Sequence, residues 1–332
     1  MSAPPENLPG RAPEASAPPP PISWRHRFSV LTAVSTLVLI VAGALVTSTG
    51  SGLAVPDWPL SYGMLMPPMV GGVLYEHGHR MVASAVGLLT LVLALWTWRA
   101  EPRLGIRRLA GAALAAVVLQ GLLGGLTVLF LLPTPISVAH ACLAQAFFCS
   151  VVALAYATSA EWRSPGTRPE DGQGLRAATG VAAAAVFVQL LLGALMRHSG
   201  AGLAVPDFPL SFGRIVPPVW NPAVGVHFAH RAFALVVLAA VLNVFARARR
   251  SEDPRLARLA ASVTLLVVVQ GALGAATVLT GKAVLVTTAH VAVGAAVLGA
   301  CWLLALRAWR LTSSRPGPEG AVVAASDRPA TA

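Results

Sequence analysis

Long apolar stretches alternate with short polar segments along most of the chain. A transmembrane helix needs about 20 consecutive and mostly apolar residues. Eight stretches reach that length: 28–48, 79–98, 108–131, 136–158, 177–197, 227–246, 257–280 and 284–306. We therefore predict an all-α integral membrane protein with eight transmembrane helices.

The polar segments divide these stretches into two sets of four. Residues 159–176 are rich in charged side chains and predict a cytoplasmic linker, which separates an N-terminal four-helix bundle at 28–158 from a C-terminal one at 177–310. The ends, 1–27 and 311–332, are rich in Pro and Ala and lack an apolar period, which predicts disordered tails.

Composition supports a membrane protein and argues against a nucleic-acid partner. The 332 residues are 56% hydrophobic and 11% charged, with a mean hydropathy of +0.70, whereas soluble domains carry about 25% charged residues. The net charge of +11 comes from arginines clustered in the ends and in alternate connections, which is how topology signals are distributed. This bias predicts a multi-pass protein of the bacterial inner membrane, in contact with lipid, with both termini cytoplasmic.

One loop sequence occurs twice. Residues 49–63 read TGSGLAVPDWPLSYG, and residues 199–213 read SGAGLAVPDFPLSFG. Further matches follow at a nearly constant offset, including a His-Arg pair after each loop. Because each half holds an even number of helices, we predict a parallel internal repeat of two pseudo-symmetric bundles, with both loops on the outer face.

Four of the eight histidines fall at equivalent points of the two halves. His79 and His140 in the first half, and His230 and His290 in the second, are each expected at or near the outer start of a helix. Facing histidines in a four-helix bundle can hold a haem by both axial positions. Imidazole also suits zinc and copper, but two histidines are too few for a closed zinc site. A porphyrin supplies the remaining nitrogens, so the pairs predict two haem-iron sites.

Three further residues are candidates because of where they stand relative to these histidines. Arg80 and Arg231 directly follow His79 and His230 and could bind haem propionates; the alternative is that they extend toward the membrane surface. Glu76 stands three residues before His79, where the second half has His227. A carboxylate in one half only suggests different jobs for the two haems, but a helix N-terminus also favours an acidic residue.

Other polar residues are given structural roles. The Pro, Asp and Gly residues of the two loops are expected to form turns that cap the haem sites, although Asp57 and Asp207 could instead contact a redox partner. Gln120 and Gln270 are expected to form interhelical hydrogen bonds. The unduplicated His77 and His198 are expected in outer loops. The three cysteines lie in apolar stretches, so no disulfide framework is predicted.

Over about residues 28–306, the chain resembles the haem A synthase family of cytochrome oxidase assembly proteins. The residues that carry the resemblance are the two loops, Glu76-x-x-His79-Arg80, His140, His230-Arg231 and His290. The resemblance implies an oxidoreductase that converts the C8 methyl of haem O to a formyl group, giving haem A for cytochrome oxidase. It also implies eight helices in two pseudo-symmetric bundles.

The resemblance assigns roles to individual residues. His230 and His290 would hold a permanent haem b, His79 and His140 would bracket the substrate haem O, and Glu76 would be the catalytic acidic residue. A haem O synthase would supply the substrate, the electron donor is unidentified, and a homo-oligomer is compatible with the sequence.

One departure and two alternatives accompany this interpretation. Some bacterial members carry a cysteine pair in the first outer loop, and residues 49–77 contain no Cys, which places the chain in the class without it and leaves any thiol-linked step in doubt. The alternatives are a non-catalytic dihaem b cytochrome in quinol-linked electron transfer and a haem-handling assembly factor. Glu76, which has no counterpart in the second half, favours the enzyme.

Overall fold

The computed structural model describes residues 23–163, 169–251 and 253–313, and these are largely helical. Eight helices are long and apolar enough to cross a membrane, as judged by length and composition. They are α1 (Trp24–Ser48), α2 (Gly72–Ala100), α3 (Leu104–Leu129), α4 (Thr134–Ala157), α6 (Gly172–His198), α7 (Pro222–Arg250), α8 (Pro254–Leu279) and α9 (Val284–Ser313). Two short elements, α5 (Ala160–Arg163) and the 3-10 turn η1 (Ala201–Leu203), join them. The predicted helical membrane class and the number of spans are confirmed.

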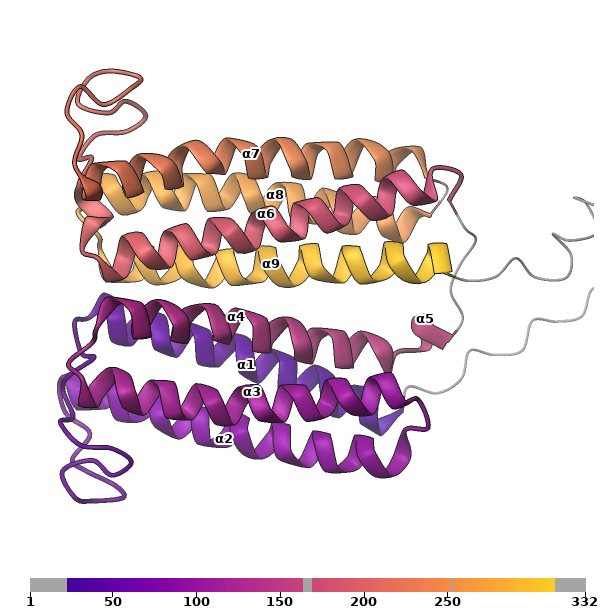
Figure 1. Ribbon diagram of the computed structural model, residues 1–332, viewed down its shortest axis with the longest axis horizontal. Coiled ribbons are helices and arrows are strands. Elements are labelled where there is room, and N and C mark those ends of the chain that lie inside the picture. Colours follow the sequence, from indigo (N-terminus) through magenta and orange to yellow (C-terminus); the bar gives the residue numbers. More distant parts are fainter. Residues whose placement is uncertain (1–22, 164–168, 252, 314–332) are drawn as a thin grey trace, which may run out of the picture.

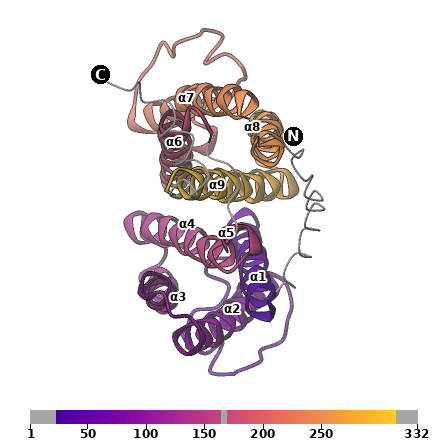
Figure 2. The ribbon, with the colours of Figure 1, turned by 90° about the vertical axis from the view of Figure 1, so that its right-hand side faces the viewer.

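The long helices lie in two groups of four (Figure 1). In the first group each of α1 to α4 packs on its neighbours and α4 returns to α1; α6 to α9 do the same in the second. The end-on view shows that α4 of the first group faces α9 of the second where the two groups meet (Figure 2). Contacts across this boundary join α1 to α9 and α4 to both α6 and α9. That the two groups form a parallel internal repeat of pseudo-symmetric bundles stays a prediction.

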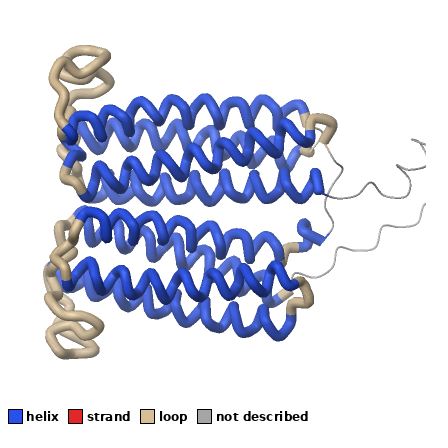
Figure 3. The backbone as a smooth tube through the Cα atoms, in the orientation of Figure 1, coloured by secondary structure: helices blue, strands red, loops and turns tan. Residues whose placement is uncertain are grey.

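The two longest connections, residues 49–71 and 199–221, project from the same end of the molecule (Figure 3). We call these segments the outer loops and this end the loop end. Several helix bounds differ from the predicted ones: α2 and α7 begin at Gly72 and Pro222, while α5 and the start of α6 fall within the predicted linker. The predicted tails lie mostly outside the described residues.

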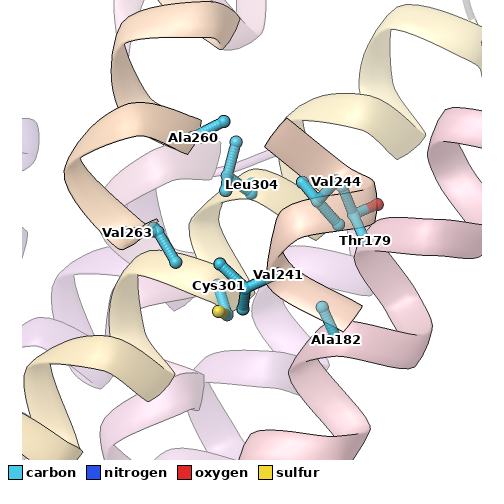
Figure 4. Close-up of a pocket in the computed structure, with 8 residues that line it drawn as sticks. All are labelled: Thr179, Ala182, Val241, Val244, Ala260, Val263, Cys301 and Leu304. Atoms are coloured by element: carbon cyan, nitrogen blue, oxygen red, sulfur yellow. The ribbon is translucent and has the colours of Figure 1, made fainter. Parts of the chain in front are cut away.

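Apolar side chains fill each group away from the loop end. Val86, Leu93 and Phe147 are buried in the first group, and Leu256, Leu298 and Leu304 in the second. In the second core, Cys301 and Thr179 lie among small apolar side chains from all four helices (Figure 4). Cys142, Cys149 and Cys301 are all free, as the sequence predicted.

The groups meet along a close-packed seam. The ring of Phe148 on α4 packs so tightly on α9 that a Cβ added at Gly299 would lie 2.7 Å from its Cε1. Nearby, the Trp302 indole donates a hydrogen bond to the Cys149 carbonyl over 2.9 Å.

At the end opposite the loops, arginines are held by a few carboxylates. Buried Glu101 pairs with Arg25 at 2.8 Å and with Arg103 at 2.6 Å. The hydrogen bond from Arg103 is the main reason that the Glu101 pKa lies below its ordinary value. Arg307 of α9 pairs with Glu161 of α5 at 2.8 Å.

Candidate functional site

The four repeated histidines lie near the loop end, within helices. His79 and His230 are in the third turn of α2 and α7, and His140 and His290 are in the second turn of α4 and α9. The expectation that His79 and His230 lie at or near a helix start is therefore corrected. Residues 72–78 are also helical, and Glu76 and His77 among them form hydrogen bonds with the outer loop.

Each of these histidines packs against a glycine on the preceding long helix. A Cβ added at the glycine would lie 3.0–3.3 Å from Cε1 of the ring, too close for the neighbour to remain in place. The pairs are Gly43 with His79, Gly124 with His140, Gly193 with His230 and Gly274 with His290. These glycines repeat in the sequence together with the histidines, so they could have been identified there, but only the structure shows what they contact.

The second pair has a geometry suited to a metal between two imidazoles. The ring centroids of His230 and His290 are 6.5 Å apart, with an angle of 74° between the ring planes. Metal–imidazole bonds of about 2 Å would place the centroids about 6 Å apart. The Nδ1 atom of His290 is buried without a hydrogen-bond partner, as are those of His79 and His140. The rings therefore fit the axial positions of a haem.

No third ligand joins either pair. Within residues 23–163, 169–251 and 253–313, no three His, Cys, Asp or Glu side chains gather as ligands for a metal ion.

Glutamines support the histidines from neighbouring helices. The Gln120 amide donates to the His140 carbonyl over 2.8 Å, and the Gln189 amide donates to the His230 carbonyl over 2.9 Å. The interhelical bond predicted for Gln120 is therefore present. The Gln270 amide nitrogen lies 3.5 Å from Nε2 of His290. Gln189 was not singled out from the sequence, since Leu39 occupies the equivalent position in the first half.

Glu76 joins the first outer loop to α2. Its side chain is buried, with 4% of the residue exposed. One carboxylate oxygen accepts a hydrogen bond from the Val55 N–H at 2.9 Å, and the other accepts one from the Arg80 guanidinium at 2.6 Å. Both oxygens are thus held, and the carboxylate is paired with a cation.

His227 faces the same two donors in the second half. The Val205 N–H lies 3.2 Å from its Nδ1, and Nε of Arg231 lies 3.0 Å from its Nε2. Neutral imidazole has one acceptor nitrogen, so it can accept from only one of these donors at a time. The two junctions thus share an architecture but differ in charge and in the number of bonds they can make.

Arg80 and Arg231 also hold the outer loops. Nη1 of Arg80 donates to the carbonyls of Asp57 and Leu60, at 2.8 and 2.9 Å. Nη1 of Arg231 donates to the carbonyls of Asp207 and Leu210, at 2.8 and 3.1 Å. This role could not be predicted from the sequence, because every residue has a backbone carbonyl and the sequence does not show which ones accept a hydrogen bond. Their contact with haem propionates stays a prediction.

Asp57 and Asp207 stabilise turns within the loops. The Asp57 carboxylate accepts from the backbone N–H groups of Tyr62 and Gly63, at 2.7 and 2.8 Å. Asp207 accepts in the same way from Phe212 and Gly213. The bonds from Gly63 and Gly213 are the main reason that both aspartate pKa values lie below the ordinary 3.8. The turn-forming role is present, and the contact with a redox partner stays a prediction.

The two unduplicated histidines are not loop residues. His77 lies within α2 with 7% of its surface exposed, and one ring nitrogen is 2.8 Å from the Ser61 hydroxyl. His198 is the last residue of α6, and its carbonyl accepts a bond from Thr134 on α4 at 3.1 Å. The expectation that both lie in outer loops is therefore wrong, since α2 and α6 extend further outward than their apolar residues indicate.

The first outer loop also sends an aromatic ring into the helix group. A Cβ added at Gly125 on α3 would lie 2.6 Å from Cδ2 of Trp58, so the indole rests on the backbone there. Gly125 adjoins Gly124, which packs on His140. The second half has Phe208 and Ala275 at the equivalent positions, a smaller ring where the helix carries a methyl group.

The fold defines a multi-pass helical membrane protein, and the two histidine pairs lie near its loop end. The chain belongs to the COX15-CtaA family, described as "Cytochrome oxidase assembly protein", which matches residues 26–71 and 69–302. The resemblance seen in the sequence is thereby confirmed.

Curated relatives cover most of the chain. A protein of Shouchella clausii named "Heme A synthase" is 33% identical over 78% of this chain and 88% of its own length. One of Symbiobacterium thermophilum with the same name is 34% identical over 72% and 80%. A third, from Halalkalibacterium halodurans, is 30% identical over 79% and 90%.

Proposed function

We propose that this chain is a haem A synthase, which oxidises the C8 methyl group of haem O to a formyl group. The family and the names of the relatives support this activity. The observation that carries the proposal is the difference between two equivalent junctions: a buried carboxylate beside the first histidine pair, and an imidazole beside the second. Electron transfer alone needs no such difference.

The histidine pairs take different roles in this proposal. His79 and His140 hold the substrate haem O, and His230 and His290 hold a resident haem b. The resident haem supplies one-electron transfer when it is bound. The protein orients both groups through histidines fixed by glycine contacts and by glutamine hydrogen bonds.

Glu76 acts at the substrate methyl group. Its two hydrogen bonds fix the orientation of the carboxylate, and the outer loop shields it from water. A carboxylate held in this way can orient a water molecule or accept a proton during oxidation of the methyl group. Conversion of the methyl to a formyl group removes four electrons from the carbon, so it would need an external oxidant. Two hydroxylations by that oxidant would give a geminal diol, which loses water to form the aldehyde. Arg80 balances the charge of Glu76 while it holds the loop closed.

The membrane setting completes the proposal. We place the protein in the bacterial inner membrane with both termini cytoplasmic, because the arginine-rich connections lie opposite the outer loops. The N-terminal bundle then holds the substrate site and the C-terminal bundle the haem b site, both near the outer face. A haem O synthase supplies the substrate, an electron donor takes part, and a homo-oligomer is compatible with this arrangement.

Pigment analysis tests the proposed function. The full chain is expressed in a membrane with a source of haem O but no other haem A synthase, and the haems are then extracted and separated. Haem A, or a hydroxylated haem O intermediate, is expected. Extracts that contain haem B alone, from protein with two occupied sites, would support a non-catalytic dihaem cytochrome instead. A chain with His79→Ala is the matched control and should yield no haem A.

A further inference from the structure

Arg197 of α6 reaches from the second helix group to the first. Its Nη2 donates to the Ala44 carbonyl at 3.0 Å and to the Ser48 hydroxyl at 2.9 Å, both on α1. The side chain is partly buried near the loop end. Both acceptors are uncharged, so these bonds leave the charge of the guanidinium unbalanced.

Three other arginines of low exposure have carboxylate partners, whereas Arg231, like Arg197, has none among the described residues. Arg80 pairs with Glu76, Arg25 with Glu101, and Arg307 with Glu161. Among the described residues, no carboxylate lies within 4.0 Å of the Arg197 guanidinium. A partly buried cation at membrane depth is costly without a counter-charge, so Arg197 indicates an anion that the protein itself does not supply.

The position of Arg197 relates that anion to the second histidine pair. Gly193, which packs on His230, lies four residues earlier in α6 and therefore on the same helix face. Arg231, the other nearby cation, is already engaged by His227 and by the carbonyls of the second outer loop.

The first histidine pair has no such cation. Thr47 occupies the position equivalent to Arg197, and its hydroxyl donates to the carbonyl of Gly43 within α1. Arg80 beside this pair is balanced by Glu76. The helices that carry the two pairs therefore differ in charge: α6 and α7 carry Arg197 and Arg231, which have no carboxylate partner among the described residues, whereas Arg80 of α2 is paired with Glu76.

We propose that Arg197 binds a propionate carboxylate of the porphyrin held by His230 and His290, and so anchors that haem against α1 of the first helix group. This inference rests on the proposed function, since it requires a resident haem at the second pair. Guanidinium binds carboxylates through charge-assisted and often bidentate hydrogen bonds. A resident haem must remain bound at the second pair, whereas the product must leave the first pair. A cation that binds a propionate at the second pair only would meet this requirement.

The test compares Arg197→Gln, Arg197→Lys and Ser48→Ala in the purified full-length holoprotein. We measure the midpoint potential of the low-spin haem and the rate at which a haem-scavenging apoprotein removes it. Arg197→Gln should release haem at least about tenfold faster, a change that corresponds to about 1.4 kcal/mol, because a charge-assisted hydrogen bond to the propionate is lost. Its potential should fall, since an unbalanced propionate favours ferric iron.

The other two variants separate charge from structure. Arg197→Lys keeps the charge and should retain most of the potential, whereas Ser48→Ala removes one bond between the groups and should leave haem properties unchanged. Wild-type potential and release rate in Arg197→Gln would overturn the inference. Absence of any low-spin haem in the wild-type protein would count against the proposed function itself.

A second measurement applies if Arg197→Gln does not fold. The wild-type protein, stripped of haem, is reconstituted with haem b or with its dimethyl ester, which lacks the propionate charges. Binding about tenfold tighter for the free acid is expected, and a weaker preference in Arg197→Lys. Equal affinity of the wild-type protein for both porphyrins would contradict the inference.

Discussion

The two junctions between outer loop and helix place the same donors around different acceptors. Val55 and Arg80 donate to the Glu76 carboxylate, while Val205 and Arg231 face the His227 imidazole. Since one junction forms with a neutral ring that can accept only one bond at a time, the fold does not require a carboxylate here. Loop attachment therefore does not explain the carboxylate of Glu76, which supports its proposed catalytic role.

Further differences gather around the same histidine pairs. The second site has Arg197 and Gln189 where the first has Thr47 and Leu39. These groups add charge and hydrogen bonds around His230 and His290. The first pair lacks both of these groups, and its nearby Arg80 is balanced by Glu76. This difference would suit the proposed exchange of the occupant in each turnover.

The largest expected effect comes from replacing one histidine of each pair and comparing the two variants. His230→Ala should abolish the low-spin b-type haem spectrum of the purified protein, because an axial ligand of the resident haem is lost. His79→Ala should keep that spectrum and lose haem A formation. Retention of the full low-spin spectrum in His230→Ala would break the assignment of the resident haem to the second pair.

The next test gives the first junction the histidine that the second junction has. Glu76→His should fold and bind haem, since His227 occupies the same position in the second half, but haem A formation should fall by about 10²-fold or more if the carboxylate acts in proton transfer. Haem A formed per mole of protein is measured against the reciprocal His227→Glu variant. Turnover at the wild-type rate in Glu76→His would show that Glu76 serves only to attach the outer loop.

A smaller effect concerns the packing of the first outer loop. Gly125→Ala should lower the free energy of unfolding by about 1–3 kcal/mol, because the new methyl group would overlap the Trp58 ring. Adding Trp58→Phe should recover much of this loss, since it recreates the pairing of Phe208 with Ala275. Thermal unfolding in detergent measures both variants, and a double variant no more stable than Gly125→Ala would show that the two differences are independent.

The smallest effect is a pH dependence that both loops should share. The pKa values of Asp57 and Asp207 are lowered in the folded protein, so their contribution to loop stability is fully present above the ordinary value of 3.8 and is lost as pH falls through the lowered values. Amide hydrogen exchange at Tyr62 and Gly63 should therefore show reduced protection in acid once the intrinsic pH dependence of exchange is subtracted. Asp57→Asn should weaken this pH dependence in the first loop only, and an unchanged profile in that variant would contradict the role of the carboxylate.

The helical class and the chemical candidates could be read from the chain, but the helix starts could not. Apolar length predicts a span at 79–98, whereas α2 begins at Gly72 and includes buried Glu76 and His77. Val55, Arg80 and Ser61 form hydrogen bonds with those polar residues. Two of these partners, Val55 and Ser61, belong to the outer loop, so local hydropathy does not register them.

By itself, the sequence determined the eight membrane-spanning helices, the repeated histidines, the family and the lone carboxylate of the first half, because each is a property of local composition or of spacing along the chain. The tertiary structure was needed to show that Glu76 and His227 occupy equivalent junctions and that Arg80 and Arg231 hold the loops. It was also needed to show that Trp58 rests on Gly125 and that Arg197 reaches the other helix group. These contacts join residues far apart in sequence, so they depend on how the helices pack and not on any local pattern.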